Sequence, residues 1–489
     1  MSRSVSPAIR VLVILGALAA LSIVQVDPPL DAQTTPPTVV DPNLAVREVV
    51  TGLTTPTTMA FLGPTHFLIL EKNTGRVLRV LDGMVQGVAL DLNVNFASER
   101  GLLGIALHPH FPGNPGVYLF WTESTSGADS NVLANVDLLG NRVDRFVWDG
   151  ATLTHDAEII RLRAFQADAG QPLRGNHDGG VIKFGPDGKL YIIFGDVGRR
   201  GWTQNLACGP TATCPPIVPD DQFGGPQPDN AHMSGVVLRL NDDGTTPVDN
   251  PLSATGLSVG AEVAANIRKI FAYGLRNSFG MDFDPVSGDL WIEQNGDDSF
   301  SEIDRVEAGM NGGWVQVMGP ISRLAQFKEI ETSTQFFGLQ QIRWPPTNIA
   351  SSTEELLERL VMLPGSHYSD PEFSWKFETA PAGMGFQRGR ALGPQYENDL
   401  FIGSAVTALQ GGQIWRLQAT GNRRMIGVDD PRLEDRVADN LAKNDITESE
   451  SLLFGRNFGV GTDIRTGPNG NLFVVSLTRG TVYEIHRVK

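Results

Sequence analysis

Phe184-Gly-Pro-Asp-Gly-Lys-Leu-Tyr191 is the stretch that decides the fold, because a β-type run stands on each side of a tight turn. It recurs as Phe283-Asp-Pro-Val-Ser-Gly-Asp-Leu-Trp291 and as Thr466-Gly-Pro-Asn-Gly-Asn-Leu-Phe473. Asp-Gly and Asn-Gly tolerate positive φ, which hairpin turns require. A hairpin that recurs along a chain is typical of a β-propeller.

Short runs rich in β-branched and aromatic residues, bounded by turn residues, continue along the chain and predict strands. The clearest runs are Phe67–Leu70, Val117–Trp121, Leu190–Phe194, Leu290–Glu293, Asp399–Ile402 and Leu472–Ser476. The segments 199–236 and 318–372 are candidates for long connections. One helix is predicted over Ser352–Val361, because a Ser/Thr cap precedes acidic residues and a helical apolar stripe.

The chain start resembles an export signal. Arg3 and Arg10 precede an apolar run over 11–24, and a small-residue cleavage position follows Ala32. We expect residues 1–32 to be a cleaved signal peptide, with an uncleaved membrane anchor as the alternative. Residues 33–44 are then a flexible lead-in, 45–489 form a single domain, and the mature protein is periplasmic or secreted.

Composition narrows the class of partner. The 489 residues include 39 Lys and Arg and 55 Asp and Glu, so the formal net charge is −16. A hydrophobic fraction of 41% excludes a disordered protein. The acidic balance argues against nucleic acid, and against an anionic membrane apart from a possible N-terminal anchor. Cys208 and Cys214 share one loop, and in an oxidising compartment a local disulfide is expected.

An imidazole and a carboxylate flank the first hairpin. His177 stands just before it and Asp196 just after it, so the pairing of its two strands brings both to one end. A carboxylate beside a histidine fixes the tautomer of the ring and suits it to act as a general base. The alternative is a histidine that only satisfies backbone groups at a turn.

Two further motifs offer a guanidinium and oxygen ligands. Arg276 and Asn277 precede the strand of the second hairpin, where Arg could bind an anionic group or pair with a local acid. The acid-rich turn over 294–303 offers carboxylate and carbonyl oxygens, which suit Ca²⁺. A solvated acidic loop remains the other interpretation. Gly101 and Gly104 indicate close backbone approach, and His108 and His110 are interpreted as structural.

Taken in chain order, these motifs resemble the soluble quinoprotein glucose/sorbosone dehydrogenase family, including the aldose sugar dehydrogenases. The residues that carry the resemblance are Glu99–Pro109, Asn176–Gly180 with Phe184–Tyr191, Gly195–Gly198, Val237–Pro251, Tyr273–Asn277, Asn398–Gly403 and Gly412–Leu417. The resemblance implies a six-bladed β-propeller with long inserted loops. It also implies pyrroloquinoline quinone (PQQ) and Ca²⁺ as cofactors, a sugar substrate and an external electron acceptor.

The same resemblance implies roles for individual residues. His177 matches the base that takes the proton of the sugar hydroxyl while hydride passes to the quinone, and Asp196 matches the carboxylate that orients it. The remaining matches are Arg276 as a catalytic and cofactor-facing residue, Glu99 and Asn277 as cofactor-binding residues, and Gly296, Asp297 and Glu302 as residues of the calcium region.

The chain departs from the family pattern where the family binds the carboxylates of the quinone. Val406 stands where a lysine is expected, and Val460 and Thr462 stand where two arginines are expected. Glu99 replaces a frequent glutamine, and Arg465 is shifted by two residues. Three hypotheses follow. The first is an exported PQQ-dependent sugar dehydrogenase with His177 as base, and the second is a catalytically inactive calcium-bearing propeller that binds a glycan or a protein. The third is a propeller hydrolase, such as a calcium lactonase, that shares only the architecture.

Overall fold

The computed structural model describes residues 35–165, 175–198, 233–253, 261–333 and 349–488. The predictions for the export signal and for Cys208 and Cys214 lie outside the described residues. Within those residues, no helix is long and apolar enough to span a membrane.

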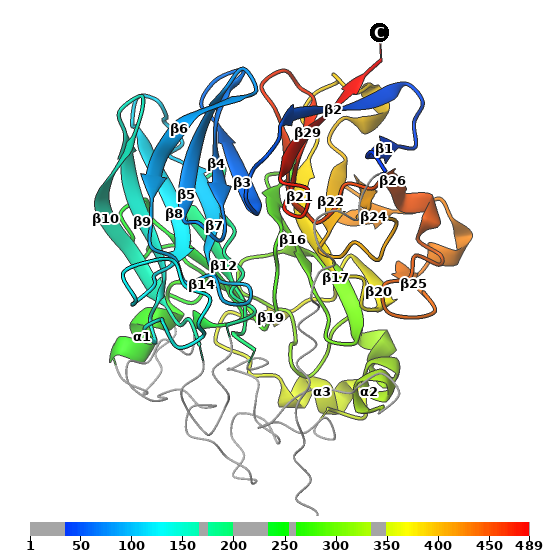
Figure 1. The fold of residues 1–489 in the computed structure, drawn as a ribbon. Helices are drawn as coiled ribbons and strands as arrows, with labels where there is room; N and C mark the ends of the chain where they lie inside the picture. The colour runs from blue at the N-terminus through cyan, green and yellow to red at the C-terminus, as the bar shows by residue number, and fades with distance from the viewer. Residues whose placement is uncertain (1–34, 166–174, 199–232, 254–260, 334–348, 489) are drawn as a thin grey trace, which may run out of the picture.

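The described strands form six sheets, arranged as a β-propeller (Figure 1). The first sheet contains β3 (Pro56–Phe61), β4 (His66–Glu71), β5 (Arg76–Leu81) and β6 (Met84–Asp91), and the second β7 (Leu102–Leu107), β8 (Gly116–Thr122), β9 (Asn141–Trp148) and β10 (Leu153–Leu162). The third contains β11 (Ile182–Phe184), β12 (Leu190–Phe194), β13 (Val236–Leu240), β14 (Ile270–Tyr273), β18 (Met310–Asn311) and β19 (His367–Tyr368). The fourth contains β15 (Met281–Phe283), β16 (Leu290–Gln294), β17 (Ser299–Val306), β20 (Phe373–Phe377) and β25 (Val437–Ala438). The fifth contains β21 (Pro381–Phe386), β22 (Leu400–Ser404), β23 (Ile414–Thr420), β24 (Met425–Gly427), β26 (Leu453–Arg456) and β1 (Thr38–Val39), and the sixth β27 (Gly461–Thr466), β28 (Leu472–Ser476), β29 (Thr481–Arg487) and β2 (Leu44–Val50).

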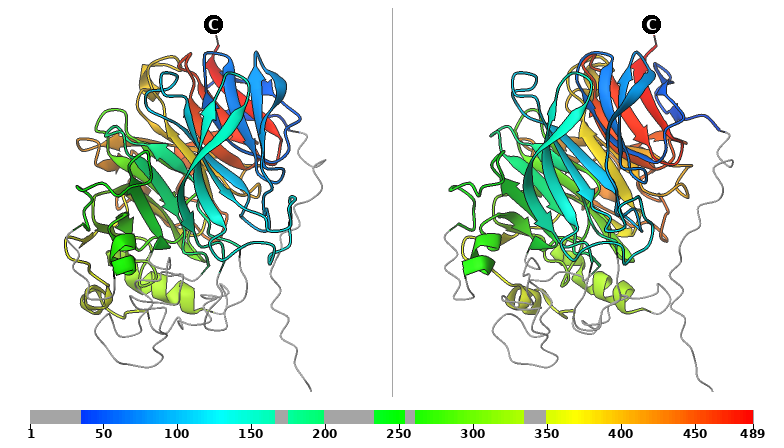
Figure 2. Two further views of the ribbon diagram at one scale, coloured as in Figure 1. Left: turned by 90° about the vertical axis from the view of Figure 1, so that its left-hand side faces the viewer. Right: turned by 60° about the vertical axis from the view of Figure 1, so that its left-hand side comes forward.

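The sheets close into a ring around a central channel. The innermost strands contact one another in the closed order β3, β7, β11, β15, β21, β27 and back to β3. The sixth sheet joins the two ends of the chain, because β2 pairs with β29 along its length. In both views of Figure 2 the first and last parts of the chain lie side by side.

Apolar clusters fill the spaces between neighbouring sheets. One example joins the first and sixth sheets, where the Phe61 ring meets the Phe473 ring edge-on at 5.1 Å between centroids. Another joins the fourth and fifth sheets, where the rings of Trp375 and Trp415 lie 5.0 Å apart. Such contacts bury both faces of the second strand of each sheet, which explains why these strands are apolar runs without alternation.

The prediction of the strand pattern is confirmed. All six predicted runs coincide with β4, β8, β12, β16, β22 and β28, each the second strand of its sheet. The repeated hairpins are β11–β12, β15–β16 and β27–β28, and Gly188, Gly288 and Gly470 in their turns have φ between 72° and 79°.

The expectation of a single helix is wrong, because the described residues contain three α-helices. The predicted one is α3 (Thr353–Arg359), capped by the Ser352 side chain, which accepts from the Glu355 N–H at 3.2 Å. The other two are α1 (Ala261–Ile267) and α2 (Leu324–Thr332). All three lie at the same end of the ring (Figure 1). Part of the expected lead-in is also a strand, since β1 pairs with β26.

Candidate functional site

His177 and Asp196 meet at the end of the first hairpin, as their positions in the sequence predict. His177 precedes β11 and Asp196 follows β12, and these two strands pair in register. His177 Nδ1 lies 2.5 Å from Asp196 Oδ1. A Cβ on Gly195 would lie 2.3 Å from the His177 carbonyl oxygen, so glycine permits the close approach of the two segments.

Asp196 is fully buried and accepts hydrogen bonds at both oxygens. The Gly198 N–H donates to Oδ1 at 2.8 Å, and Trp314 Nε1 donates to Oδ2 at 2.8 Å. Burial alone would raise the pKa of Asp196, but the charge and hydrogen bond of His177 hold it below its ordinary value. An ionised Asp196 accepts a hydrogen bond from the protonated Nδ1 of His177, which leaves Nε2 as the basic nitrogen of the ring.

Arg276 and Asn277 lie beside this pair, between β14 and β15. Arg276 Nη1 donates to the Asn295 carbonyl at 2.7 Å, and Nη2 donates to Asp297 Oδ1 at 2.8 Å. The guanidinium lies over the Trp314 ring, 5.6 Å from its centroid. Burial lowers the pKa of Arg276, but the charges of Asp297 and Asp196 outweigh burial and raise it, so the group is cationic.

Glu99 joins these residues across three sheets. Its Oε2 accepts from the His177 backbone N–H at 2.7 Å and from Asn277 Nδ2 at 3.1 Å. The carboxylate therefore positions the segment that carries His177 and the segment that carries Asn277. Gly104, a few residues later, lies so close to the Gly180 carbonyl that a Cβ would be 2.1 Å from it, which confirms the predicted close approach.

The residues predicted for the calcium region separate into two groups. Asp297 lies with Asp298 and Glu331, and these three carboxylates each offer an oxygen within 4.8 Å of the others. Gly296 is the buried residue that precedes Asp297. Glu302 lies in the other group, where Gln294 Nε2 donates to it at 2.9 Å and the Gly319 N–H donates to it at 2.6 Å.

Buried acids in both groups hold protons tightly. Burial, together with the charge of the neighbouring Asp304, raises the pKa of Glu302 well above its ordinary value. Burial and the charges of Asp297 and Asp298 raise the pKa of Glu331 to about 8. The Asp298 carboxylate also contacts Lys443 Nζ at 2.6 Å. Each group therefore gathers potential oxygen ligands in a buried place.

The structure adds two residues that the sequence motifs did not indicate. Trp314 comes from the segment after β18 and Glu331 from α2. An apolar cluster that includes Trp314, Phe327 and Leu356 packs α2 and α3 against the segment that holds Trp314. No local pattern marks either residue, because this packing joins segments that are distant in the sequence.

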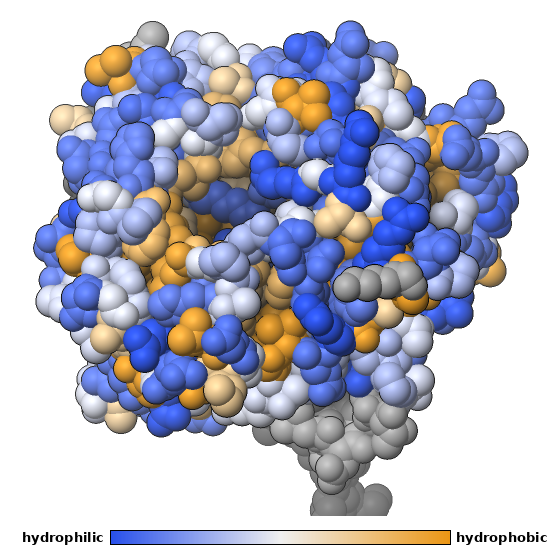
Figure 3. All heavy atoms as spheres, turned by 90° about the horizontal axis from the view of Figure 1, so that it is seen from above, coloured by the Kyte–Doolittle hydropathy of each residue, from blue (hydrophilic) through white to orange (hydrophobic). Residues whose placement is uncertain are grey.

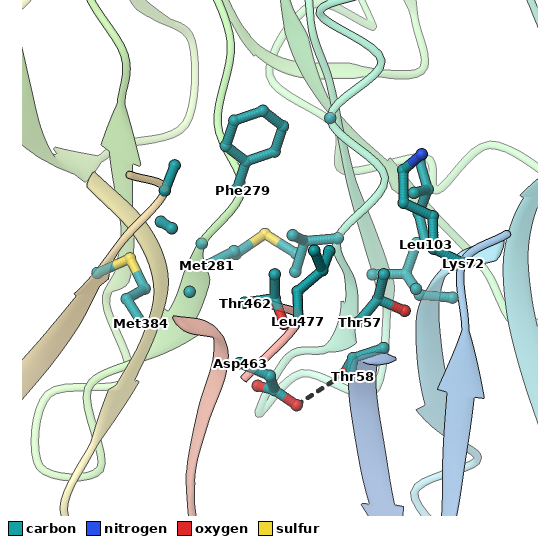
Figure 4. A pocket seen from close by; sticks show the side chains of 18 of the residues that line it. Thr57, Thr58, Lys72, Leu103, Phe279, Met281, Met384, Thr462, Asp463 and Leu477 are labelled. Atoms are coloured by element: carbon teal, nitrogen blue, oxygen red, sulfur yellow. Dashed lines mark hydrogen bonds between the residues drawn. The ribbon is translucent and has the colours of Figure 1, made fainter. Parts of the chain in front are cut away.

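A cavity of about 340 Å³ occupies the channel next to these residues. Its wall includes Glu99, Gly179 and Phe279, so it begins beside the segments that carry His177 and Asn277. Figure 4 shows Phe279, Met281 and Met384 on one side and Thr57, Leu103 and Lys72 on another. A second cavity of about 850 Å³ continues toward the hairpin turns, where Figure 3 shows the surface hollowed.

Comparison with known proteins gives a family match. The model of the family described as "Glucose / Sorbosone dehydrogenase" matches residues 53–356. Quinoprotein glucose dehydrogenase B of Acinetobacter calcoaceticus is 30% identical over 281 residues, which cover 57% of this chain and 53% of that protein. Aldose sugar dehydrogenase YliI of Escherichia coli is 24% identical over 425 residues, 86% of each chain.

A solved structure shares the fold. The PQQ-bound form of an aldose sugar dehydrogenase from Streptomyces coelicolor matches with a TM-score of 0.54 at 20% identity, covering 91% of this chain and 98% of that one. At this identity the likeness supports the propeller arrangement alone.

Proposed function

The chain belongs to the glucose/sorbosone dehydrogenase family, and from this premise we propose that it is an exported oxidoreductase that oxidises an aldose-type sugar hydroxyl with PQQ as hydride acceptor. The observation that carries the proposal is the buried His177–Asp196 pair beside the channel cavity, whose wall includes Glu99 and Gly179. We take each of the six sheets as one blade. Export is supported by the basic and apolar pattern before Ala32.

A buried donor next to the channel cavity fits a quinone oxygen. Arg276 Nε is a buried donor, and Asn277 Oδ1 is a buried acceptor, without a hydrogen-bond partner among the described residues. A buried donor without a partner costs about 1–3 kcal/mol, so a bound group with acceptor oxygens would stabilise this arrangement. Arg276 and Asn277 would hold the group, which supplies a two-electron acceptor when bound, and Glu99 would position Asn277 beside it.

His177 would act on the sugar. Nε2 of its ring would accept the proton of the hydroxyl, while the carbon that bears this hydroxyl would give its hydride to the two-electron acceptor. Asp196 keeps the other ring nitrogen protonated and stabilises the imidazolium that forms. Arg276, already cationic, stabilises negative charge that develops on the acceptor side. Electrons then leave the protein through an external acceptor.

Calcium, which the family resemblance implies, suits the acids next to Arg276. Ca²⁺ prefers carboxylate and carbonyl oxygens. Asp297, Asp298 and Glu331 supply the carboxylates at this position, and Glu331 Oε2 is buried without a partner among the described residues. Gly296 offers a carbonyl in the same turn, while Glu302 lies on β17 and accepts a hydrogen bond from Gln294.

The test is to add PQQ and Ca²⁺ to the purified protein, measure binding by calorimetry, and follow reduction of a dye with a panel of aldoses. His177→Gln should lower kcat by about 10²–10⁴-fold while cofactor binding persists. The matched control is His108→Gln. His108 also faces an acid, Asp242 Oδ2 at 3.3 Å, but it follows the end of β7 that is remote from Glu99.

Two results would overturn the proposal. If the wild-type protein binds no PQQ at high concentration, the alternative of an inactive calcium-bearing propeller for a glycan or protein is favoured. If His177→Gln oxidises aldoses as fast as the wild type, the base is a different residue.

A further inference from the structure

The cavity in the channel is lined by few charged residues. Its wall consists mostly of small and apolar side chains, and the charged residues of the described wall are Lys72, Glu99, Lys183, Asp463 and Arg465. The part of the wall formed by Val460, Thr462 and Leu477 carries no charge (Figure 4). Any anionic group of a bound molecule must therefore find its cation among three residues.

Two of these cations are already neutralised. Lys183 Nζ lies 2.8 Å from Asp282 Oδ1, and Arg465 Nε lies 2.5 Å from Asp463 Oδ2. Both residues also line the second cavity, so they mark the deep end of the first. An ion pair presents little net charge to a ligand, because the field of one partner cancels most of the field of the other.

Lys72 is different because its ammonium contacts only neutral acceptors. Nζ donates to the Ser98 carbonyl at 2.9 Å, and to the Phe96 carbonyl and Asn73 Oδ1 at 3.3 Å each. None of the salt bridges among the described residues includes Lys72. Burial lowers the pKa of Lys72 to about 8, an effect that the charges of Glu99 and Asp178 partly offset, so at neutral pH the group is a half-buried cation without a salt bridge among the described residues.

The position of Lys72 is fixed relative to the candidate active site. Its carbonyl accepts from the Leu102 N–H at 3.1 Å, and a Cβ on Gly101 would lie 2.4 Å from that same oxygen. Through its hydrogen bonds to the Phe96 and Ser98 carbonyls, the ammonium contacts the segment that leads into Glu99. Because Glu99 holds both His177 and Asn277, the cation and the reactive end of the site are joined through one short segment.

We propose that Lys72 is the cationic contact for a carboxylate of the molecule bound in this cavity, and that this molecule is the quinone cofactor. The inference rests on the proposed function. A half-buried ammonium on a cavity wall whose direct hydrogen-bond acceptors are all neutral can make a charge-assisted hydrogen bond to a carboxylate in the cavity. Lys72 thus places a positive charge on the wall just after β4, on the sheet next to the uncharged part of the wall formed by Val460, Thr462 and Leu477.

The experiment is a titration of the whole protein with PQQ in the presence of Ca²⁺, read out by calorimetry or by fluorescence quenching rather than by turnover. Lys72→Met should weaken PQQ affinity by about 10- to 100-fold, the effect of one charge-assisted hydrogen bond. Lys72→Arg should keep most of the affinity, because it keeps the charge. The matched control is Lys189→Met, since Lys189 bonds Asn241 Oδ1 at 2.7 Å and does not line the cavity.

A change in the ligand tests the same contact without relying on the fold of a variant. The trimethyl ester of PQQ lacks the carboxylate charges, so the wild type should prefer PQQ to the ester, and Lys72→Met should lose about 10- to 100-fold of that preference. Circular dichroism and thermal unfolding of each variant verify that it is folded.

Three outcomes would overturn the inference, and they differ. If the wild type binds PQQ and Lys72→Met binds it equally well, the inference fails and the proposed function stands. If Lys72→Met instead raises only the KM for sugar acids relative to neutral sugars, the carboxylate belongs to the substrate. If the wild type binds no PQQ, the proposed function fails together with the inference.

Discussion

Replacing Asp196 by asparagine tests the reasoning about the candidate base most directly, because the change removes the charge and alters only one atom. Asp196 receives hydrogen bonds at both oxygens, from His177 and Gly198 on one side and from Trp314 on the other. An asparagine offers one oxygen and one amide nitrogen, so it cannot satisfy donors on both sides.

Both orientations of the asparagine have a cost. If its nitrogen faces Trp314, two N–H groups oppose each other in a buried place, which costs about 1–3 kcal/mol of stability. If its nitrogen faces His177, it donates to Nδ1 and the ring proton moves to Nε2, which can then no longer accept a proton from the sugar. We expect kcat to fall by about 10²–10⁴-fold with a much smaller change in KM.

The assay is steady-state reduction of an artificial electron acceptor by protein loaded with PQQ and Ca²⁺, with a separate titration of cofactor affinity. The matched control is Asp144→Asn in β9, because Asp144 is also fully buried and accepts from an indole, Trp121 Nε1, at 2.6 Å. The control should lose stability and keep its kcat. A kcat of Asp196→Asn within about threefold of wild type would refute the tautomer argument.

Three further predictions follow from the same geometry. Glu99→Gln keeps an acceptor for its two donors but removes a negative charge from the cavity wall, so PQQ affinity should rise by about 10- to 100-fold. An unchanged affinity in the PQQ titration would contradict this. Burial raises the pKa of Asp178 to about 6 from 3.8, so its ionisation destabilises the folded protein as pH rises through about 4–6. Urea unfolding should therefore show Asp178→Asn gaining stability relative to wild type between pH 4 and pH 8, by up to about 3 kcal/mol. Gly104→Ala places a Cβ 2.1 Å from a backbone oxygen and should lower the free energy of unfolding by about 1–3 kcal/mol, whereas Gly63→Ala, with no neighbour closer than 3.7 Å, is the control.

The second strand of each sheet could be predicted because the apolar pattern that marks it lies within the strand itself. A strand packed between two neighbouring sheets must be apolar on both faces, and every predicted run turned out to be a second strand such as β12 or β28. The helices divide in the same way. Ser352 caps α3 and marks it in the sequence, whereas the N-cap of α2 is Arg323, whose side chain makes no capping hydrogen bond.

The candidate site shows the same limit. The contact between His177 and Asp196 could be predicted, since one hairpin sets the distance between the residues that flank it. Trp314, Glu331 and Lys72 could not, because each reaches the site through packing between segments far apart in the chain. Glu302 matched a family motif, yet its side chain contacts Gln294 rather than the acids around Asp297.

The joining of β2 to β29 has a consequence for how the molecule is assembled. Leu44 pairs with Arg487, so the last sheet needs residues from both extremes of the polypeptide. The propeller ring can close only after nearly the whole chain is present. Ring closure is therefore expected to be a late and slow step of folding compared with formation of the hairpins. A version shortened before Val50 would leave β29 as a bare edge, inviting pairing with another molecule. By pairing with β29, strand β2 therefore covers an edge that would otherwise be open to aggregation.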